Sequence, residues 1–136
     1  MKRLITLTFL PSFSNLGLLL LRLWFGLGLF FLHGLDKVKD ISGTVGFMGK
    51  MGIPSYLAMA AILTESLGAL LLAAGFATRW AALALATNMA VAFSQVHHFA
   101  LKGEHSGEMA FLYLGAFAAL VFTGAGRFSV DAKLSK

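Results

Sequence analysis

The sequence has no cysteine and few charged residues. None of its 136 residues is cysteine, so disulfides, thiolate metal sites and thiol redox chemistry are excluded. Charged residues make up 12% of the chain, whereas soluble domains carry about 25%. Hydrophobic residues make up 58%, which is more apolar surface than a soluble core of this size can bury. The composition therefore predicts that much of the surface faces lipid.

The sequence also lacks the short motifs of common catalytic sites. No phosphate loop, nucleophile elbow or zinc-protease motif occurs in it. The net charge of +5 would suggest a nucleic-acid partner in a soluble protein. Here the basic residues flank the apolar runs, where membrane topology explains them better. We therefore expect no nucleic-acid partner.

Four long apolar runs cover residues 15–35, 54–76, 80–101 and 107–124. About 20 apolar residues are enough for a helix to cross the hydrocarbon core of a bilayer. The fourth run is the shortest, and it spans only if its first turn includes Glu108. The runs predict an all-α fold, an integral membrane bundle of four transmembrane helices, with residues 1–136 forming a single domain.

Two segments outside these runs have different characters. Residues 41–53 are too rich in glycine and polar groups to span, so we expect an external loop or a short surface helix there. Residues 4–14 carry spaced apolar side chains, which is typical of a segment that lies in the membrane interface.

The basic residues predict the orientation in the membrane. Four spans place both termini on one side, together with six basic residues: Lys2, Arg3, Arg79, Arg127, Lys133 and Lys136. The other side has four: Lys37, Lys39, Lys50 and Lys102. Because cytoplasmic loops carry an excess of Lys and Arg, we expect both termini in the cytoplasm.

Two ionisable residues stand out inside the apolar runs, Arg22 in the first and Glu65 in the second. Each isolated charge there costs about 2.5–3.5 kcal/mol on insertion scales. Their depths differ by about 6 Å at the helical rise per residue, a gap that the long arginine side chain can bridge. We therefore predict an ion pair between them, with Asn88 at about the depth of Glu65. Three interpretations stay open: structural glue, a buried polar site for a small ligand, and a proton or ion path.

The polar residues of the first three runs lie on faces that helical spacing defines. The face of the first run consists of Arg22, Gly26, Leu29, His33 and Lys37. Small residues accompany Glu65 and Asn88 on their own runs, which would let the helices approach closely. We expect the three faces to meet and to form a polar ligand site. The candidate binding residues are Arg22, His33, Lys37, Glu65, Asn88 and His97.

Histidines and carboxylates gather at the expected outer face: His33, His97, His98, His105, Glu104 and Glu108. Such groups can bind a divalent metal. However, the adjacent His97 and His98 point about 100° apart on a helix. We therefore favour histidines that anchor the interface, and we predict no tight metal site.

Short motifs follow one another along the chain in a characteristic order. They are Arg22 with Gly26, His33-Gly34-Leu35-Asp36-Lys37, Glu65-Ser66-Leu67-Gly68, Gly75 with Arg79, His97, and Gly124-Ala125-Gly126-Arg127-Phe128-Ser129-Val130-Asp131. In this order and spacing, over about residues 18–131, they resemble the DoxX family of small membrane proteins. The resemblance implies a four-helix fold in a bacterial inner membrane.

The resemblance also implies redox or quinone-linked work. Relatives include a thiosulfate:quinone oxidoreductase subunit, proteins associated with catechol and quinone stress, and a membrane partner of superoxide dismutase. The implied function is a quinone-linked oxidoreductase subunit, or a redox-associated membrane component that binds a small lipid-soluble ligand in the bundle; no intrinsic cofactor is expected, and a quinone is the candidate ligand. Arg22 or His33 would bind a quinone oxygen, and Glu65 would hold Arg22.

A function of a different class stays open as the alternative, namely a non-catalytic membrane anchor or assembly factor for a soluble redox enzyme. Whether the chain is an enzyme is therefore open as well. The expected partners are the lipid bilayer and a soluble or membrane redox protein. Association with a second copy of the chain is also open.

Overall fold

The computed structural model describes residues 13–136, and these residues form helices and connecting turns with no β-strand among them. In chain order the α-helices are α2 (Ser14–Leu29), α3 (Leu35–Lys39), α4 (Ile41–Lys50), α5 (Ser55–Leu63), α6 (Ala69–Ala74), α7 (Thr78–Val91), α8 (Glu108–Thr123) and α9 (Val130–Leu134). The π-helical segments are η1 (Phe30–Gly34), η2 (Thr64–Gly68) and η3 (Ala92–Val96). The all-α fold class is thus confirmed for the described part. The predicted interfacial segment, residues 4–14, lies almost wholly outside the described residues.

Two of the helices have the length and composition of membrane spans. α2, η1 and α3 form one continuous helix, Ser14–Lys39, of 26 residues, and α5, η2 and α6 form another, Ser55–Ala74, of 20 residues. Both are long and apolar enough to cross a bilayer. α8 has 16 residues, or about 24 Å at the helical rise. The runs predicted at 15–35 and 54–76 thus correspond to helices of spanning length, while the number of spans stays a prediction.

The third helix ends earlier than predicted. α7 and η3 cover residues 78–96. Shortly after them, two consecutive residues, His98 and Phe99, adopt positive φ values of 48° and 60°. A left-handed backbone cannot continue a right-handed helix. Phe99 instead turns back onto Phe93, with the two ring centroids 5.5 Å apart. The predicted end at residue 101 is therefore wrong.

α4 is the short surface helix that residues 41–53 allowed. Asp40 caps it, because Oδ1 of this residue accepts a hydrogen bond from the amide of Gly43 at 2.9 Å. Every residue of α4 is exposed or half-buried. Beyond it, Gly52 adopts a positive φ of 79° and Pro54 is extended, which turns the chain into α5.

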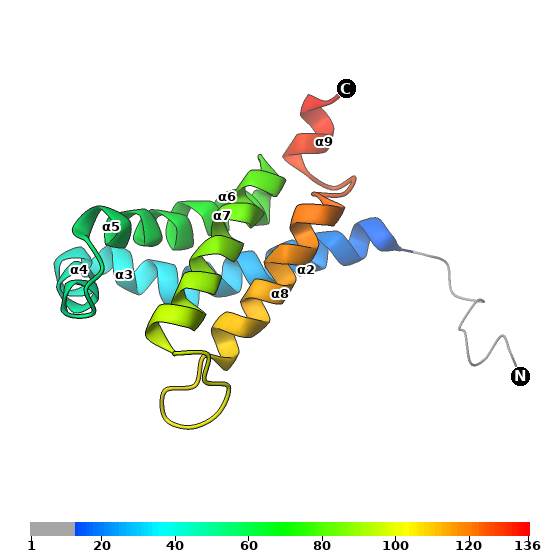
Figure 1. The fold of residues 1–136 in the computed structure, drawn as a ribbon. Coiled ribbons are helices and arrows are strands. Elements are labelled where there is room, and N and C mark those ends of the chain that lie inside the picture. Colours follow the sequence, from blue (N-terminus) through cyan, green and yellow to red (C-terminus); the bar gives the residue numbers. More distant parts are fainter. Residues whose placement is uncertain (1–12) are drawn as a thin grey trace, which may run out of the picture.

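The helices form two hairpins (Figure 1). In the first, Gly26 lies against Ala73 and Gly34 lies against Glu65, so α2–α3 and α5–α6 run antiparallel. α7 and α8 form the second hairpin, which runs steeply across the first in Figure 1. α9 lies at the end where α6 turns into α7.

Glycine lets the two helices of the first hairpin touch. A Cβ atom on Gly26 would lie 2.8 Å from the carbonyl oxygen of Ala69, and one on Gly34 would lie 2.5 Å from that of Glu65. Neither position has room for a larger side chain. The small residues predicted on the buried faces therefore serve close helix approach.

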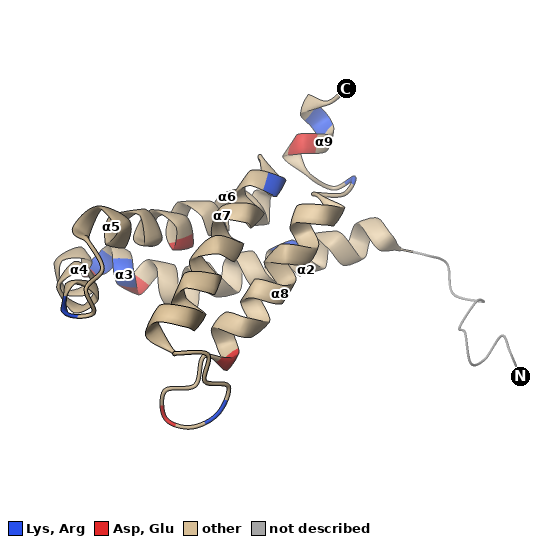
Figure 2. Cartoon of the chain, viewed as in Figure 1, with Lys and Arg blue, Asp and Glu red and all other residues tan. Residues whose placement is uncertain are grey.

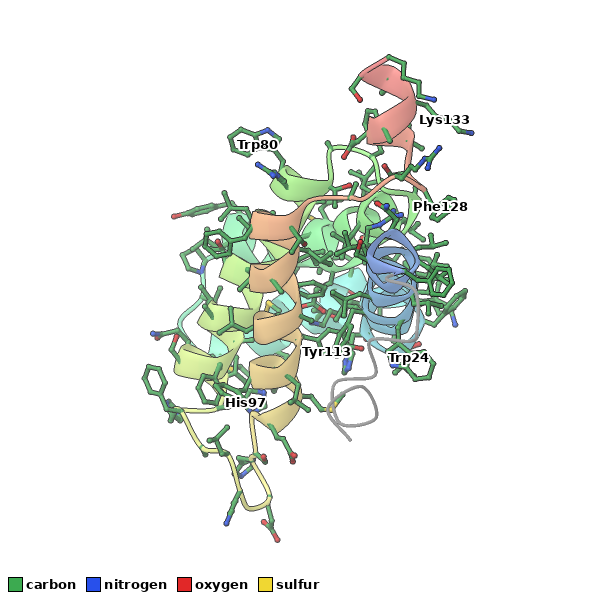
Figure 3. The ribbon with its side chains drawn as sticks, turned by 90° about the vertical axis from the view of Figure 1, so that its right-hand side faces the viewer. Trp24, Trp80, His97, Tyr113, Phe128 and Lys133 are labelled. Atoms are coloured by element: carbon green, nitrogen blue, oxygen red, sulfur yellow. The ribbon has the colours of Figure 1, made fainter. Side chains whose placement is uncertain are left out.

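The buried core lies between the two hairpins, and an apolar surface suited to lipid contact lies on the outside. Leu29, Leu72, Leu85 and Phe117 are at most 1% exposed. Large apolar side chains point outward elsewhere: Trp24 is 80% exposed and stands away from the bundle in Figure 3. Apolar exposure on this scale is unfavourable in water and suits contact with lipid.

Candidate functional site

Glu65 is the centre of a polar cluster that joins three helices. Its Oε2 atom lies 2.5 Å from Nζ of Lys37, and its Oε1 atom accepts a hydrogen bond from Nδ2 of Asn88 at 2.8 Å. The side chain of Glu65 is 5% exposed and that of Lys37 is 27% exposed. Lys37 comes from α3, Glu65 from η2 and Asn88 from α7. We call these three residues the polar cluster. The prediction that Asn88 lies at the depth of Glu65 is confirmed.

The predicted ion pair between Arg22 and Glu65 is wrong. Arg22 is fully buried, and its guanidinium donates to the carbonyl oxygens of Ala73 at 3.1 Å, Leu72 at 3.4 Å and Phe128 at 2.5 Å. The first two oxygens lie at the end of α6, where carbonyls lack intrahelical donors. Ala73 follows Glu65 by eight residues, or about 12 Å along the helix. Arg22 therefore faces the end of α6, while Glu65 faces Gly34 and Lys37.

Asp131 holds the same end of the molecule from the C-terminal side. Its carboxylate accepts hydrogen bonds from the amides of Ala77 at 2.7 Å and Thr78 at 2.9 Å, and its own amide donates to the carbonyl oxygen of Gly75. Because Thr78 begins α7, this carboxylate caps a helix supplied by another part of the chain. Burial alone would raise the pKa of Asp131, but the hydrogen bonds from Thr78 and Ala77 and the nearby Arg22 charge outweigh it and lower that pKa. The motif at residues 124–131 thus fastens the C-terminal segment.

His33 lies away from the polar cluster because of the π-helical turn η1. In a π-helix the residues i and i+5 stack on one face. The buried face of the first helix therefore continues from Leu29 to Gly34, and His33 is exposed. Its ring lies 6.4 Å from that of Tyr113, on another side of the bundle. The predicted face of the first helix is correct up to Leu29 and wrong at His33.

A pocket of about 920 Å³ lies beside the polar cluster. Its lining is mostly apolar and comes from α3–α4, α5–η2 and α7–η3; it includes Lys37, Asp40, Thr44, Phe47, Met48, Ile53, Leu57, Thr64, Glu65, Ala84, Thr87, Asn88, Val91, Gln95 and His97. Four of the six predicted site residues line this pocket: Lys37, Glu65, Asn88 and His97. The other two, Arg22 and His33, do not.

The α4 side of the pocket was not predicted, because residues 41–53 were expected to form an external loop or a short surface helix. Thr44, Phe47 and Met48 of α4 line the pocket. Their spacing of three and four residues marks one helical face. Together with the capping residue Asp40, that spacing was a usable signal for a helix packed over the site.

The polar cluster keeps hydrogen-bonding capacity for a ligand. A lysine ammonium has three donors and an asparagine amide has two. In the described part of the chain, Lys37 and Asn88 each give one of these to Glu65. The charges of Lys37 and Glu65 compensate each other, and the remaining donors of Lys37 and Asn88 can bind a ligand that carries hydrogen-bond acceptors.

All three π-helical segments of the described chain border this region. η1 precedes Lys37, η2 carries Glu65, and η3 carries Gln95 and leads to His97. Single π-helical turns inside α-helices are frequent at functional sites. This backbone feature therefore agrees with the pocket as the functional site.

The outer histidines do not converge. Among residues 13–136, no group of three or more His, Cys, Asp or Glu side chains is placed to hold a metal ion. Nδ1 of His97 lies 3.0 Å from the carbonyl oxygen of His105. The absence of a tight metal site stays a prediction for the whole protein.

The polar cluster and its pocket fall within a region that known proteins share. A family model described as DoxX matches residues 17–98. The chain belongs to the DoxX family. The matched region contains all six residues predicted for the site, and it ends before the motif at residues 124–131.

Curated relatives cover most of the chain. It is 34% identical over 119 residues to a Bacillus subtilis protein named "Putative oxidoreductase CatD", covering 86% of each chain. It is 31% identical over 131 residues to the Escherichia coli "Inner membrane protein YqjF", covering 93% of this chain and 98% of that one. An uncharacterized Haemophilus influenzae protein is 36% identical over 115 residues, covering 79% of this chain and 84% of that one. No solved structure matches. Together with the family match, these relatives make this DoxX protein a membrane protein.

Proposed function

We propose that this protein is the quinone-binding membrane component of a redox system, and that the pocket beside the polar cluster holds the quinone ring. The observation that supports the proposal most is the Lys37–Glu65–Asn88 cluster, in which the charges of Lys37 and Glu65 balance each other. It lies beside a mostly apolar pocket of about 920 Å³. Ligand pockets of about 300–1,000 Å³ with a few polar groups are typical of small-molecule sites. A quinone is neutral and flat, and it carries two carbonyl acceptors.

The structure changes which residues are assigned to the quinone. Lys37 and Asn88, in place of Arg22 and His33, would donate hydrogen bonds to one carbonyl oxygen, and Glu65 would hold both donors. His97 also lines the pocket, nine residues after Asn88 in the chain, and would approach the ring's other side. The apolar lining between α5 and α7, with Leu57 and Val91, would receive the ring and the start of its lipid tail.

The chain has no redox group of its own, so the electrons would come from a partner protein. The Bacillus subtilis relative's name supports a redox role for this family member. The protein would then act as a binding subunit. A non-catalytic anchor or assembly factor is the alternative, and it requires no occupied pocket.

Quinone titration of the protein in nanodiscs, followed by thermal unfolding, tests the proposal. A saturable rise in unfolding temperature is expected for a quinone. Asn88→Ala should weaken quinone binding about tenfold. A hydrogen bond to a ligand is worth about 0.5–1.5 kcal/mol. Without the Asn88 amide, the Glu65 carboxylate that positions Lys37 is also held less firmly. Asn15→Ala is a matched control, since Asn15 contacts the amide of Arg127 and lies outside the pocket.

Two outcomes would count against the proposal. One is the absence of a saturable response with any quinone. The other is equal weakening by Asn88→Ala and Asn15→Ala. A stoichiometric soluble partner that co-purifies with a quinone-free protein would then favour the anchor function.

We propose further that all four long helices span the bacterial inner membrane with both termini in the cytoplasm. The excess of Lys and Arg at the end with the termini supports this orientation. Alkaline phosphatase fused near Gly103 should be active, and the same enzyme fused at residue 136 should be inactive. The reverse pattern would refute the orientation.

A further inference from the structure

The end of the molecule that holds the C-terminal segment carries an excess of positive charge. Its exposed basic residues in the described chain are Arg79, Arg127, Lys133 and Lys136. The ion pairs within residues 13–136 are Lys37–Glu65 and Lys39–Asp36, so no carboxylate lies within 4.0 Å of these four cations. The acidic residue at this end of the described chain, Asp131, accepts hydrogen bonds from two backbone amides, and its single negative charge leaves an excess of positive charge.

The opposite end has no such imbalance. Its basic residues, Lys37, Lys39, Lys50 and Lys102, alternate with the acidic residues Asp36, Asp40, Glu104 and Glu108. Figure 2 shows blue and red segments mixed around α3, α4 and the loop before α8. The attraction for an anion is therefore specific to one end.

A second cavity, of about 600 Å³, lies at the positive end. The start of α7, the end of α8 and the C-terminal segment line it, with Arg79 and Trp80 from α7 and Gly124 from the turn after α8. Asp131 also lines it, and both oxygens of its carboxylate accept hydrogen bonds from backbone amides, those of Ala77 and Thr78. Arg79 donates one hydrogen bond to the carbonyl oxygen of Phe122 at 3.3 Å. A guanidinium has five N–H donors, so Arg79 keeps most of its donors for a ligand in this cavity.

Exposed aromatic side chains surround the same end. Trp80 is 76% exposed and Phe128 is 54% exposed. Figure 3 places both, with Lys133, at the end opposite to His97. Tryptophan is enriched where a membrane helix meets the headgroup layer. A ligand here would therefore meet charge and apolar surface together.

The geometry points to a site for the phosphate headgroup of an anionic phospholipid in this cavity, with Arg79 as the main phosphate ligand. Arginine matches phosphate oxygens with two parallel hydrogen bonds. The other cations would add attraction for an anionic lipid surface. Trp80 and Phe128 would lie against the glycerol and upper acyl region, which free phosphate lacks. The position of this end at a membrane surface rests on the proposed topology.

Native mass spectrometry tests the site on the full-length protein. The protein is released from nanodiscs that contain equal amounts of phosphatidylglycerol and phosphatidylcholine. One phosphatidylglycerol should stay bound, while phosphatidylcholine should not. Arg79→Gln should reduce the occupancy about fivefold, the effect of one cation near an anionic lipid surface, and Arg79→Lys should restore part of it.

Lys102→Gln is the matched control, because it removes one cation from the balanced end. It should leave phosphatidylglycerol occupancy unchanged, and so should excess inorganic phosphate. Equal occupancy by both lipids, equal losses in Arg79→Gln and Lys102→Gln, or displacement by inorganic phosphate would each overturn the proposal.

Tryptophan fluorescence checks the placement separately. In a Trp24→Phe background the signal comes from Trp80, and lipids spin-labelled at the headgroup should quench it more than lipids labelled deep in the acyl chain. Stronger quenching by the deep label would refute the surface placement and with it the lipid site. Neither result depends on quinone binding at the other pocket.

Discussion

Replacing Lys37 by methionine should destabilise the protein more than replacing Glu65 by glutamine. In Lys37→Met, a carboxylate that is 5% exposed loses its cation and keeps one amide, that of Asn88, at 2.8 Å. Breaking a fully buried ion pair costs about 3–5 kcal/mol. Lys37 is 27% exposed, which reduces the effect, so we expect a loss of about 2–3 kcal/mol.

Glu65→Gln should cost about 1 kcal/mol. Lysine can swing its ammonium group toward water on its long stem, and Lys37 already has partial access to the surface. Glutamine also keeps a carbonyl oxygen for the amide of Asn88. The double variant lacks both charges, so its cost should be below the sum of the singles by about 1–2 kcal/mol.

Unfolding with a denaturing detergent in mixed micelles, followed by circular dichroism, measures these free energies. The cycle of Arg22→Met with Glu65→Gln is the control. Since Arg22 contacts the end of α6, about 12 Å along the helix from Glu65, their losses should add to within about 0.5 kcal/mol. Additive losses for Lys37 and Glu65, or strong coupling for Arg22 and Glu65, would refute the arrangement of charges described above.

Two further predictions concern packing and pH. Gly34→Ala should cost about 1–3 kcal/mol of stability, because the new Cβ would lie 2.5 Å from the carbonyl oxygen of Glu65. The control is Gly46→Ala, whose Cβ would meet nothing within 4 Å, so this change should be neutral or stabilising. Thermal unfolding measures both, and equal losses would contradict the close approach at Gly34. Asp131→Asn should cost about 1 kcal/mol at pH 7 through the lost helix cap. Because the folded pKa of Asp131 is lowered, its stabilisation is complete above the ordinary value of 3.8 and is lost as the pH falls toward the folded pKa. Unfolding curves from pH 7 to pH 3 should therefore show a smaller acid loss in Asp131→Asn than in the wild type, and equal acid losses would contradict this role of Asp131.

The lengths of the apolar runs were enough to place the first two long helices. Burial in lipid demands about 20 apolar residues, and the two longest helices, Ser14–Lys39 and Ser55–Ala74, satisfy that demand. The end of the third helix was not predictable in the same way. It depends on two left-handed residues, His98 and Phe99, and on a ring that packs back against Phe93. No local sequence pattern in an apolar segment predicts that turn.

The polar contacts were predicted where they depend on depth and missed where they depend on register. Glu65 and Asn88 meet because both lie in the middle of their helices. His33 was placed wrongly, since the π-helical turn η1 adds a residue to its turn and rotates it off the face. An ideal spacing of three and four residues cannot reveal such an insertion.

The error at Arg22 has a different cause, and it separates the roles of the two polar systems. A charge in an apolar run suggests an opposite charge as its partner, but the carbonyls at a helix end offer the same relief. Arg22 is fully buried against those carbonyls and lines neither of the two cavities. Lys37 is the cation that keeps access to a pocket. The access of a charged group to a cavity, more than its depth in the membrane, therefore distinguishes a residue that binds a ligand from one that holds the helices together.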